Sequence, residues 1–282
     1  MNSPRLLRIA TRKSPLALWQ AKRIASLLES EMGYQSELVP MSTTGDRQTQ
    51  WNLSQKGGKG LFTKELEDAL LHGDVDLAVH SAKDMPTECP PGLSLSAFAE
   101  REDPRDVLVL KKGIQNPKVM ATGSPRRQAQ LKTRFPKSQW IQLRGNVETR
   151  LRKIAEQHEA EGTILASAGL ARLGLTNFPG LKFMYLPVSE MVPAAGQGAI
   201  AIQTRSSEKD EYTILGNPKT QREVGIERKV LESQGGGCQI ALGVCMNEDS
   251  IHFFEEKTGY LSFSCSEMSE SEILNKIKDF DK

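Results

Sequence analysis

The chain has 282 residues, of which 38% are hydrophobic and 26% charged, so it is long enough for two or three domains with ordinary cores. Its formal net charge of +2 excludes a global field that would draw it onto nucleic acid. No apolar run reaches the roughly 20 residues of a membrane helix, and the first residues lack the apolar centre of a signal peptide. The four scattered cysteines form no CxxC pair or zinc set, which predicts free thiols in a reducing cytoplasm and no metal site.

Strands and helices alternate from the N-terminus. Residues 6–10 read as a strand, and Ser14-Pro15 begins a helix whose apolar positions keep helical spacing as far as Gly33. A strand at 37–40, a helix at 61–71 and a short buried strand at 76–79 follow. This alternation predicts an α/β fold with a mainly parallel sheet and helices on its faces.

The same order of elements returns in the middle of the chain. Residues 118–122 read as a strand, Gly123 as a turn, and Ser124-Pro125 as the start of a helix to about Phe135. Residues 10–15 and 121–125 therefore look like matching positions in two similarly built domains. Further strands are expected at 140–143 and 163–166, with a helix at 146–158 between them.

The chain is expected to cross between these two domains twice, near residues 100–104 and 192–196. A strand at 199–202 would then return to the first domain, and two crossings would make a double hinge around a central cleft. A small α+β domain with a final helix completes the chain. We predict domain 1 at residues 1–98 and 197–216, domain 2 at 99–196, and a C-terminal domain at 217–282.

Arginines gather where strands end and helices begin. Between residues 126 and 153 there are nine basic residues and one acid, Glu148. Helix N-termini bind anions, and arginine grips a carboxylate with two parallel N–H bonds. The grouping therefore favours a ligand with several carboxylates, although some of these arginines could simply be solvated on helix faces. The arginines in question are Arg12, Arg126, Arg127, Arg144 and Arg150.

The segment after the strand at 76–79 brings a hydroxyl, an ammonium and a carboxylate together in Ser81, Lys83 and Asp84. Pro86 prevents a helix from forming across this loop. The end of a strand is the usual place for chemistry in an open α/β sheet. The alternative is a solvated Lys–Asp pair, and His80 is expected to pack at the strand end.

Two glycine-rich segments differ in what they allow. Residues 57–60 do not satisfy GxxxxGK[ST], so a phosphate-binding loop is rejected in favour of a mobile loop over the cleft. Residues 235–237 are three glycines directly before Cys238. They would give mobility and leave room for a bulky group on the sulfur, although a buried, inert cysteine is the alternative.

Taken in order, the motifs resemble those of the hydroxymethylbilane synthase (porphobilinogen deaminase) family. Each is weak alone, but the ordered set covers nearly the whole chain. The matching segments are Arg8-Ile9-Ala10-Thr11-Arg12, 14–20, 57–62, 80–86, 100–106, Arg126-Arg127-Gln128, Arg144-Gly145-Asn146-Val147, Ala168-Gly169-Leu170, Gly196-Gln197-Gly198-Ala199 and Gly236-Gly237-Cys238.

The resemblance implies three domains, the first two arranged like a two-lobed periplasmic binding protein. It also implies a dipyrromethane cofactor joined by a thioether to Cys238, and a deaminase that condenses four porphobilinogen molecules into hydroxymethylbilane. Asp84 would be the catalytic group, and Arg12, Gln20, Arg144, Arg150 and Arg172 would bind substrate. The cofactor would be held by Ser81, Lys83, Thr122, Ser124, Arg126, Arg127, Arg144, Gly145 and Arg150. We expect a cytoplasmic monomer with no nucleic-acid or membrane partner.

The chain departs from the family pattern at Gly123, Pro125, Gly235, Ala241 and Gln203, and its third domain is short. These departures leave Asp84 and Cys238 untouched but put the rigidity of the cofactor loop in doubt. Two other classes remain open. A two-lobed anion receptor would not explain the glycine–cysteine loop, and a nucleic-acid binder would need more aromatic residues among its charges than Phe135 and Trp140.

Overall fold

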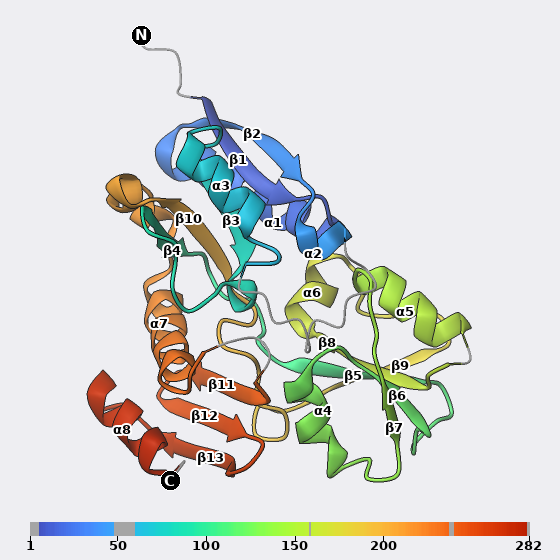
Figure 1. Cartoon of the computed structure of the whole chain (residues 1–282). Helices are drawn as coiled ribbons and strands as arrows, with labels where there is room; N and C mark the ends of the chain where they lie inside the picture. The colour runs from blue at the N-terminus through green and yellow to red at the C-terminus, as the bar shows by residue number, and fades with distance from the viewer. Residues whose placement is uncertain (1–5, 48–59, 158, 237–239, 281–282) are drawn as a thin grey trace.

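The computed structural model describes residues 6–47, 60–157, 159–236 and 240–280, which form two α/β lobes and a smaller third unit (Figure 1). Within these ranges no helix is both long and apolar enough to cross a membrane. The helical elements are α1 (Pro15–Met32), α2 (Thr44–Arg47), α3 (Lys64–His72), η1 (Ala82–Asp84), α4 (Pro125–Lys132), α5 (Val147–Glu156), α6 (Ser167–Arg172), η2 (Ser206–Leu215), α7 (Pro218–Ser233) and α8 (Glu270–Phe280).

The strands form three sheets. They are β1 (Leu6–Arg12), β2 (Gln35–Met41), β3 (Leu77–Ser81), β4 (Leu93–Phe98), β5 (Asp106–Lys111), β6 (Val119–Ala121), β7 (Gln139–Ile141), β8 (Gly162–Ala166), β9 (Leu181–Tyr185), β10 (Ile200–Arg205), β11 (Leu242–Asn247), β12 (Ser250–Glu255) and β13 (Gly259–Ser264).

The first sheet has the order β2-β1-β3-β10-β4. β1 runs parallel to β2 and β3, whereas β10 is antiparallel to β3 and β4. Apolar residues of α1, such as Ile24 and Leu28, pack with Leu7 and Ile9 on one face. Leu66 and its neighbours on α3 cover the other face. Both faces are thereby buried, as a largely parallel sheet requires.

The second sheet repeats this plan with the order β7-β6-β8-β5-β9. β6 is parallel to β7 and β8, and β5 is antiparallel to β8 and β9. Leu151 and Ile154 of α5 pack on one face, and Leu131 of α4 packs on the other. In each sheet the fourth strand in order runs against the rest, so the expectation of a mainly parallel sheet is confirmed with one exception per sheet.

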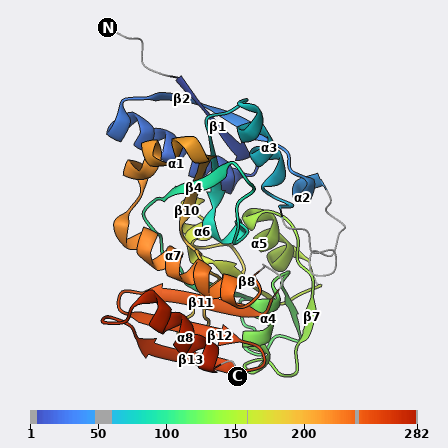
Figure 2. The same cartoon turned by 60° about the vertical axis from the view of Figure 1, so that its left-hand side comes forward.

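The third unit is the antiparallel meander β11-β12-β13, covered by α7 and α8 (Figure 2). Val230, Phe253, Ile273 and Ile277 lie in its buried core. Two α/β lobes with a small α+β unit confirm the predicted fold class. Some element bounds were wrong: the helix expected from 61 begins at Lys64, and the helix expected to reach about Phe135 ends at Lys132.

Candidate active site

A cavity of about 470 Å³ is lined by residues of both α/β lobes. It collects the ends of strands β1 and β3 from the first lobe and the loops after β6 and β7 from the second. Twelve of the fourteen residues predicted for the site line it: Arg12, Gln20, Ser81, Lys83, Asp84, Thr122, Ser124, Arg127, Arg144, Gly145, Arg150 and Arg172. Arg126 is not in this lining, and Cys238 lies outside the described residues.

The two Ser-Pro helix starts are built alike. The side chain of Ser14 accepts from the Ala17 N–H at the start of α1, and that of Ser124 accepts from the Arg127 N–H at the start of α4. In both helices proline takes the first position, where no backbone donor is needed. Ser14 and Ser124 both line the cavity, which therefore has one helix start in each lobe.

Arg12 does not stand alone at the end of β1. Its guanidinium pairs with Asp46 and lies 4.3 Å from the centroid of the Phe62 ring. Burial opposes ionisation of Asp46, but the bonds from Arg12 and Thr43 keep its pKa below the ordinary value. Sequence reasoning missed Asp46 and Phe62. The one signal was that Asp46 follows strand β2 at the same sheet edge as Arg12.

The loop after β3 enters the cavity as the single turn η1. Gln20 of α1 donates to Ser81 Oγ at 2.9 Å and so fixes the start of the turn. Lys83 donates to Gln197 Oε1 at 3.3 Å. Burial, and then the positive charge of Arg127, lowers the pKa of Lys83 to about 8. Lys83 and Asp84 are half-buried in the cavity lining, which disfavours a merely solvated pair.

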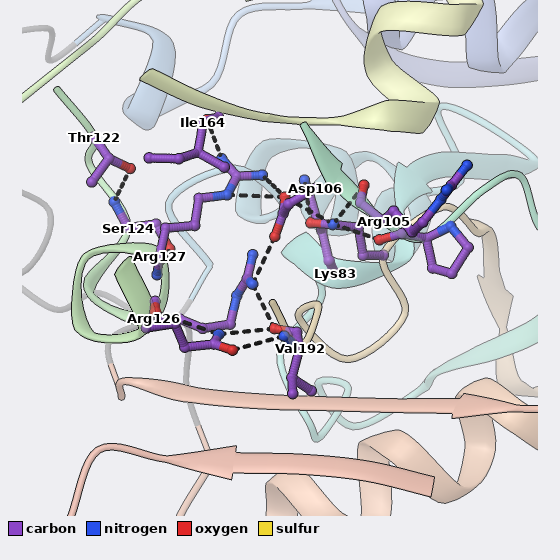
Figure 3. A network of polar contacts seen from close by, with 12 residues as sticks. Lys83, Arg105, Asp106, Thr122, Ser124, Arg126, Arg127, Ile164 and Val192 are labelled. Atoms are coloured by element: carbon purple, nitrogen blue, oxygen red, sulfur yellow. Dashed lines mark hydrogen bonds and ion pairs between the residues drawn. The ribbon is translucent and has the colours of Figure 1, made fainter. Parts of the chain in front are cut away.

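A buried carboxylate, Asp106, holds the arginine pair of α4 (Figure 3). Arg126 Nη1 donates to its Oδ2 at 2.8 Å, while Arg127 Nη2 and Nε donate to its Oδ1 at 2.7 and 3.1 Å. Burial opposes ionisation of Asp106, but the charges of Arg126 and Arg127 outweigh it and hold the pKa well below its usual range. Two guanidinium groups share one carboxylate, so the cluster keeps excess positive charge.

Within this cluster only Arg127 reaches the cavity lining. It also donates from Nη1 to the Ile164 carbonyl at 3.0 Å, whereas Arg126 Nη1 donates to the Val192 carbonyl at 2.6 Å. Asp106 belongs to a segment that carried the family resemblance, but sequence reasoning assigned it no role. An aspartate directly before the apolar strand residues 107–110 was the available signal, because a buried carboxylate needs a cationic partner.

The loop after β7 and the helix α5 that follows it present two further arginines, Arg144 and Arg150. Gly145 has φ +121°, and a Cβ there would lie 2.8 Å from Thr149 Cγ2, so only glycine fits without a shift. Its carbonyl accepts from Arg150 Nε at 2.7 Å. Burial, followed by Arg127 and Arg144, lowers the pKa of Arg150 to about 10. The neighbouring guanidinium groups of this lobe thus make it harder for Arg150 to keep its proton.

Arg172, at the end of α6, reaches back to the crossing between the lobes. Its Nη2 donates to the Gly198 carbonyl at 2.6 Å, and its guanidinium lies 5.4 Å from the centroid of the Trp19 ring. Burial lowers its pKa to about 10. Its buried Nε has no hydrogen-bond partner among the residues that the structure describes. A donor left open in this way suits an anionic ligand.

The charge count of the cavity agrees with that reading. Six cationic side chains and two carboxylates, Asp46 and Asp84, are found among its described lining residues. Cations crowded in such excess, with Arg127 and Arg172 buried and the others partly exposed, are costly unless an anion joins them. A ligand with several carboxylates, such as a dipyrromethane bearing acetate and propionate groups, therefore fits the residues present.

Two contacts hold the segment before Cys238 against the first lobe. Arg228 of α7 donates from Nη2 to the carbonyls of Pro86 and Thr87, at 2.6 and 2.9 Å. Gly236 has φ +54°, and a Cβ there would lie 3.0 Å from Thr87 Oγ1. The backbone leading to Cys238 thus lies against the turn that follows Asp84. The sequence suggested mobility as the reason for the glycines. At Gly236 there is a second reason, because a side chain there would press against Thr87.

His80 packs at the strand end, as expected. It is buried, and its Nε2 lies 3.0 Å from Gln203 Oε1. Burial lowers its pKa to about 4, so the ring is neutral at ordinary pH. Residues 57–59, expected to form a mobile loop over the cleft, lie outside the described residues.

The chain is similar to known proteins over most of its length. A curated porphobilinogen deaminase of Syntrophomonas wolfei is 47% identical over 245 residues, which are 84% of this chain and 79% of that protein. The porphobilinogen deaminase of Geobacter metallireducens is 44% identical over 249 residues, 85% of this chain and 77% of that protein. Among solved structures, the periplasmic VFT2 domain of Bordetella pertussis BvgS aligns with a TM-score of 0.46 and 16% identity, over 79% of this chain and 93% of that domain.

The sequence model of one family, described as "Porphobilinogen deaminase, dipyromethane cofactor binding domain", matches residues 7–213. This span contains every described residue of the cationic cavity. Since both the family model and the relatives cover most of the chain, the chain belongs to the porphobilinogen deaminase family.

Proposed function

We propose that this chain joins four porphobilinogen molecules head to tail in the cavity between its lobes. Each addition releases one ammonia, and one water then hydrolyses off the finished chain as the linear tetrapyrrole hydroxymethylbilane. The observation that carries the proposal is the excess of cationic side chains that line the cavity around a single catalytic-loop carboxylate, Asp84. Every pyrrole unit brings an acetate and a propionate, so a growing chain needs many cationic partners and few anionic ones.

Asp84 is the group that we assign to the chemistry. Loss of ammonia from porphobilinogen leaves an electron-poor azafulvene with a pyrrolic N–H. A carboxylate beside it stabilises the developing positive charge and exchanges protons with the substrate. Asp84 sits on the turn η1, whose start is fixed by the Gln20–Ser81 bond, so its position is defined by the first lobe.

The surrounding residues divide by lobe. Arg12 and Gln20 face the incoming substrate from the first lobe, together with Arg172 beside the hinge. The carboxylates of the cofactor and growing chain are held mainly from the second lobe. Arg126 is bonded to Asp106 and Val192, and we therefore propose that it acts through Asp106. The holding residues are Ser81, Lys83, Thr122, Ser124, Arg127, Arg144, Gly145 and Arg150.

A dipyrromethane joined by a thioether to Cys238 would supply the free pyrrole position at which the chain grows. Cys89, Cys245 and Cys265 are poor alternatives, because none of them lines the cavity and the last two are buried. Burial also raises the pKa of Cys245, which makes its thiolate scarce. Cys238→Ser should abolish both the mass adduct and turnover, and an adduct mapped to another cysteine would refute the attachment.

We also propose that the working unit is a cytoplasmic monomer that needs neither nucleic acid nor a membrane. Its support is that one chain provides both walls of the cavity. Domain 1 would comprise residues 1–98 and 197–216, domain 2 residues 99–196, and domain 3 residues 217–282. Gel filtration with light scattering tests the monomer directly.

The role of Asp84 is tested with Asp84→Asn, which keeps the size of the side chain but removes its charge and proton exchange. We expect a folded protein that retains cofactor and loses about 10²–10⁴-fold of its turnover. Asp84→Glu keeps the charge at a displaced position and should be impaired less. The measurements are steady-state consumption of porphobilinogen, a melting curve and intact mass. Near-normal turnover in a folded, cofactor-loaded Asp84→Asn variant would remove Asp84 from the mechanism.

A further inference from the structure

Gln197 bridges the two lobes with its side-chain amide. It lies in the second crossing between β9 and β10 and is 1% exposed. Its Oε1 accepts from Lys83 Nζ at 3.3 Å, and its Nε2 donates to Asp106 Oδ1 at 3.1 Å and to the Pro104 carbonyl at 2.7 Å. One end of the amide thus contacts the catalytic loop of the first lobe. The other end contacts the carboxylate that holds the arginine pair of the second.

The backbone around Gln197 leaves this side chain little freedom. A Cβ at Gly196 would lie 3.0 Å from Ala82 Cβ, and a Cβ at Gly198 would lie 2.4 Å from the Glu102 carbonyl oxygen. Both glycines have positive φ, of +71° and +94°. The second crossing is therefore pressed against η1 on one side and against the first crossing on the other. The Gln197 carbonyl also accepts from Arg101 Nε at 2.9 Å.

The chemistry of an amide suits this place better than the alternatives do. Lys83 is faced by the charges of Arg126, Arg127, Asp84 and Asp106. A neutral group with an acceptor at one end and a donor at the other links the ammonium to Asp106 without changing that balance. Glutamate would keep the acceptor but set a second carboxylate beside Asp106, and methionine would keep the length but lose the bonds to Lys83, Asp106 and Pro104.

We infer that Gln197 is a positioning residue. Through its bonds to Lys83 and to Asp106, it fixes the distance across the cleft between the Lys83 ammonium and the Arg127 guanidinium. Both cations line the cavity, so their separation decides how ligand carboxylates are gripped between the lobes. The effect on turnover rests on the proposed function of the site. The contact between Gln197 and Lys83 can be tested without that function, because it affects how fast the Lys83 amine is acetylated.

The test compares Gln197→Met and Gln197→Glu with Gln130→Met in the cofactor-loaded protein. Gln130 is a matched control, because its buried amide also makes a donor and an acceptor bond, to Val192 O at 3.0 Å and Val192 N at 2.7 Å. It touches neither Lys83 nor Asp106 in the structure. Melting curves should show similar losses for the two methionine variants, as expected for a buried amide lost at either site.

Turnover and lysine labelling should separate the variants. Gln197→Met should lower kcat/KM for porphobilinogen by on the order of 10²-fold, as displaced binding groups do, while Gln130→Met stays within a few-fold of the wild type. The second readout is acetylation of Lys83 by acetic anhydride at pH 8, followed by peptide mass mapping. The new carboxylate in Gln197→Glu should slow it about tenfold, since an adjacent negative charge favours the protonated amine.

Two results would overturn the inference. One is equal labelling of Lys83 in the wild type and in Gln197→Glu, and the other is an equal loss of turnover in Gln130→Met and Gln197→Met. A wild-type protein that consumed no porphobilinogen would instead refute the proposed function. Lys83 labelling would still decide whether Gln197 holds the ammonium.

Discussion

Replacing Asp106 with asparagine removes the only negative charge that the described structure places between the Arg126 and Arg127 guanidinium groups. The side chains of the two arginines are 5% and 8% exposed, and that of Asp106 is fully buried. Breaking a buried ion pair by removing one partner costs about 3–5 kcal/mol, because the remaining charge stays buried without compensation. Since 1 kcal/mol moves the midpoint of a unit of 150–250 residues by about 2–4 °C, Asp106→Asn should lower Tm by roughly 10 °C.

The control is Asp103→Asn, three residues earlier in the same segment. Asp103 pairs with Arg105 at 2.9 Å, but their side chains are 31% and 44% exposed, so the loss should stay within about 1 kcal/mol. Circular-dichroism melts of the two variants, with intact mass to follow cofactor loading, make the comparison. We expect Asp106→Asn also to load less cofactor, since Arg127 loses its anchor. Equal shifts in Tm for both variants would refute the assignment of Asp106 as the carboxylate that neutralises the pair.

Three further outcomes are expected. Gly236→Ala should load less cofactor by intact mass than Gly235→Ala, because both have positive φ but only Gly236 lies against a neighbour; equal loading would contradict this. His80 takes up a proton near pH 6.5 when unfolded but only near pH 4 when folded. The free energy of unfolding should therefore fall by up to about 3 kcal/mol as the pH is lowered from 6.5 to 4. His80→Gln should flatten that slope in urea melts, and an unchanged slope would exclude His80. Arg150→Leu should stall elongation with partial chains visible by mass, whereas normal intermediates would argue against a ligand contact.

Local sequence signals predicted those parts of the fold that local physics decides. Ser14 and Ser124 were identified as helix starts because a serine followed by proline satisfies the first turn whatever lies around it. The convergence of Arg127 and Arg144 also followed, because strand ends of one lobe meet at one edge. Arg12 was placed at the matching edge of the other lobe because residues 10–15 and 121–125 look alike. Strand β5 and its antiparallel direction were not predicted, since direction depends on where the chain re-enters a sheet.

The residues that the sequence did not reveal are those whose partners lie far along the chain. Asp106 meets Arg127 across 21 positions, and Gln197 meets Lys83 across 114. A buried carboxylate or amide shows its need for a partner only when burial is known. A charged or polar residue in the sequence could equally be solvated, and no spacing rule connects such distant positions.

The place of β10 has a consequence for how the protein is made. Among the described strands β4 pairs only with β10, which is more than a hundred positions later in the chain (Figure 1). On the ribosome, the first lobe therefore waits for Arg205 to emerge before its sheet can close, whereas all five strands of the second sheet lie between residues 106 and 185. We expect the second lobe to fold first although it is synthesised later, and a chain released before residue 200 to leave β4 without a neighbour.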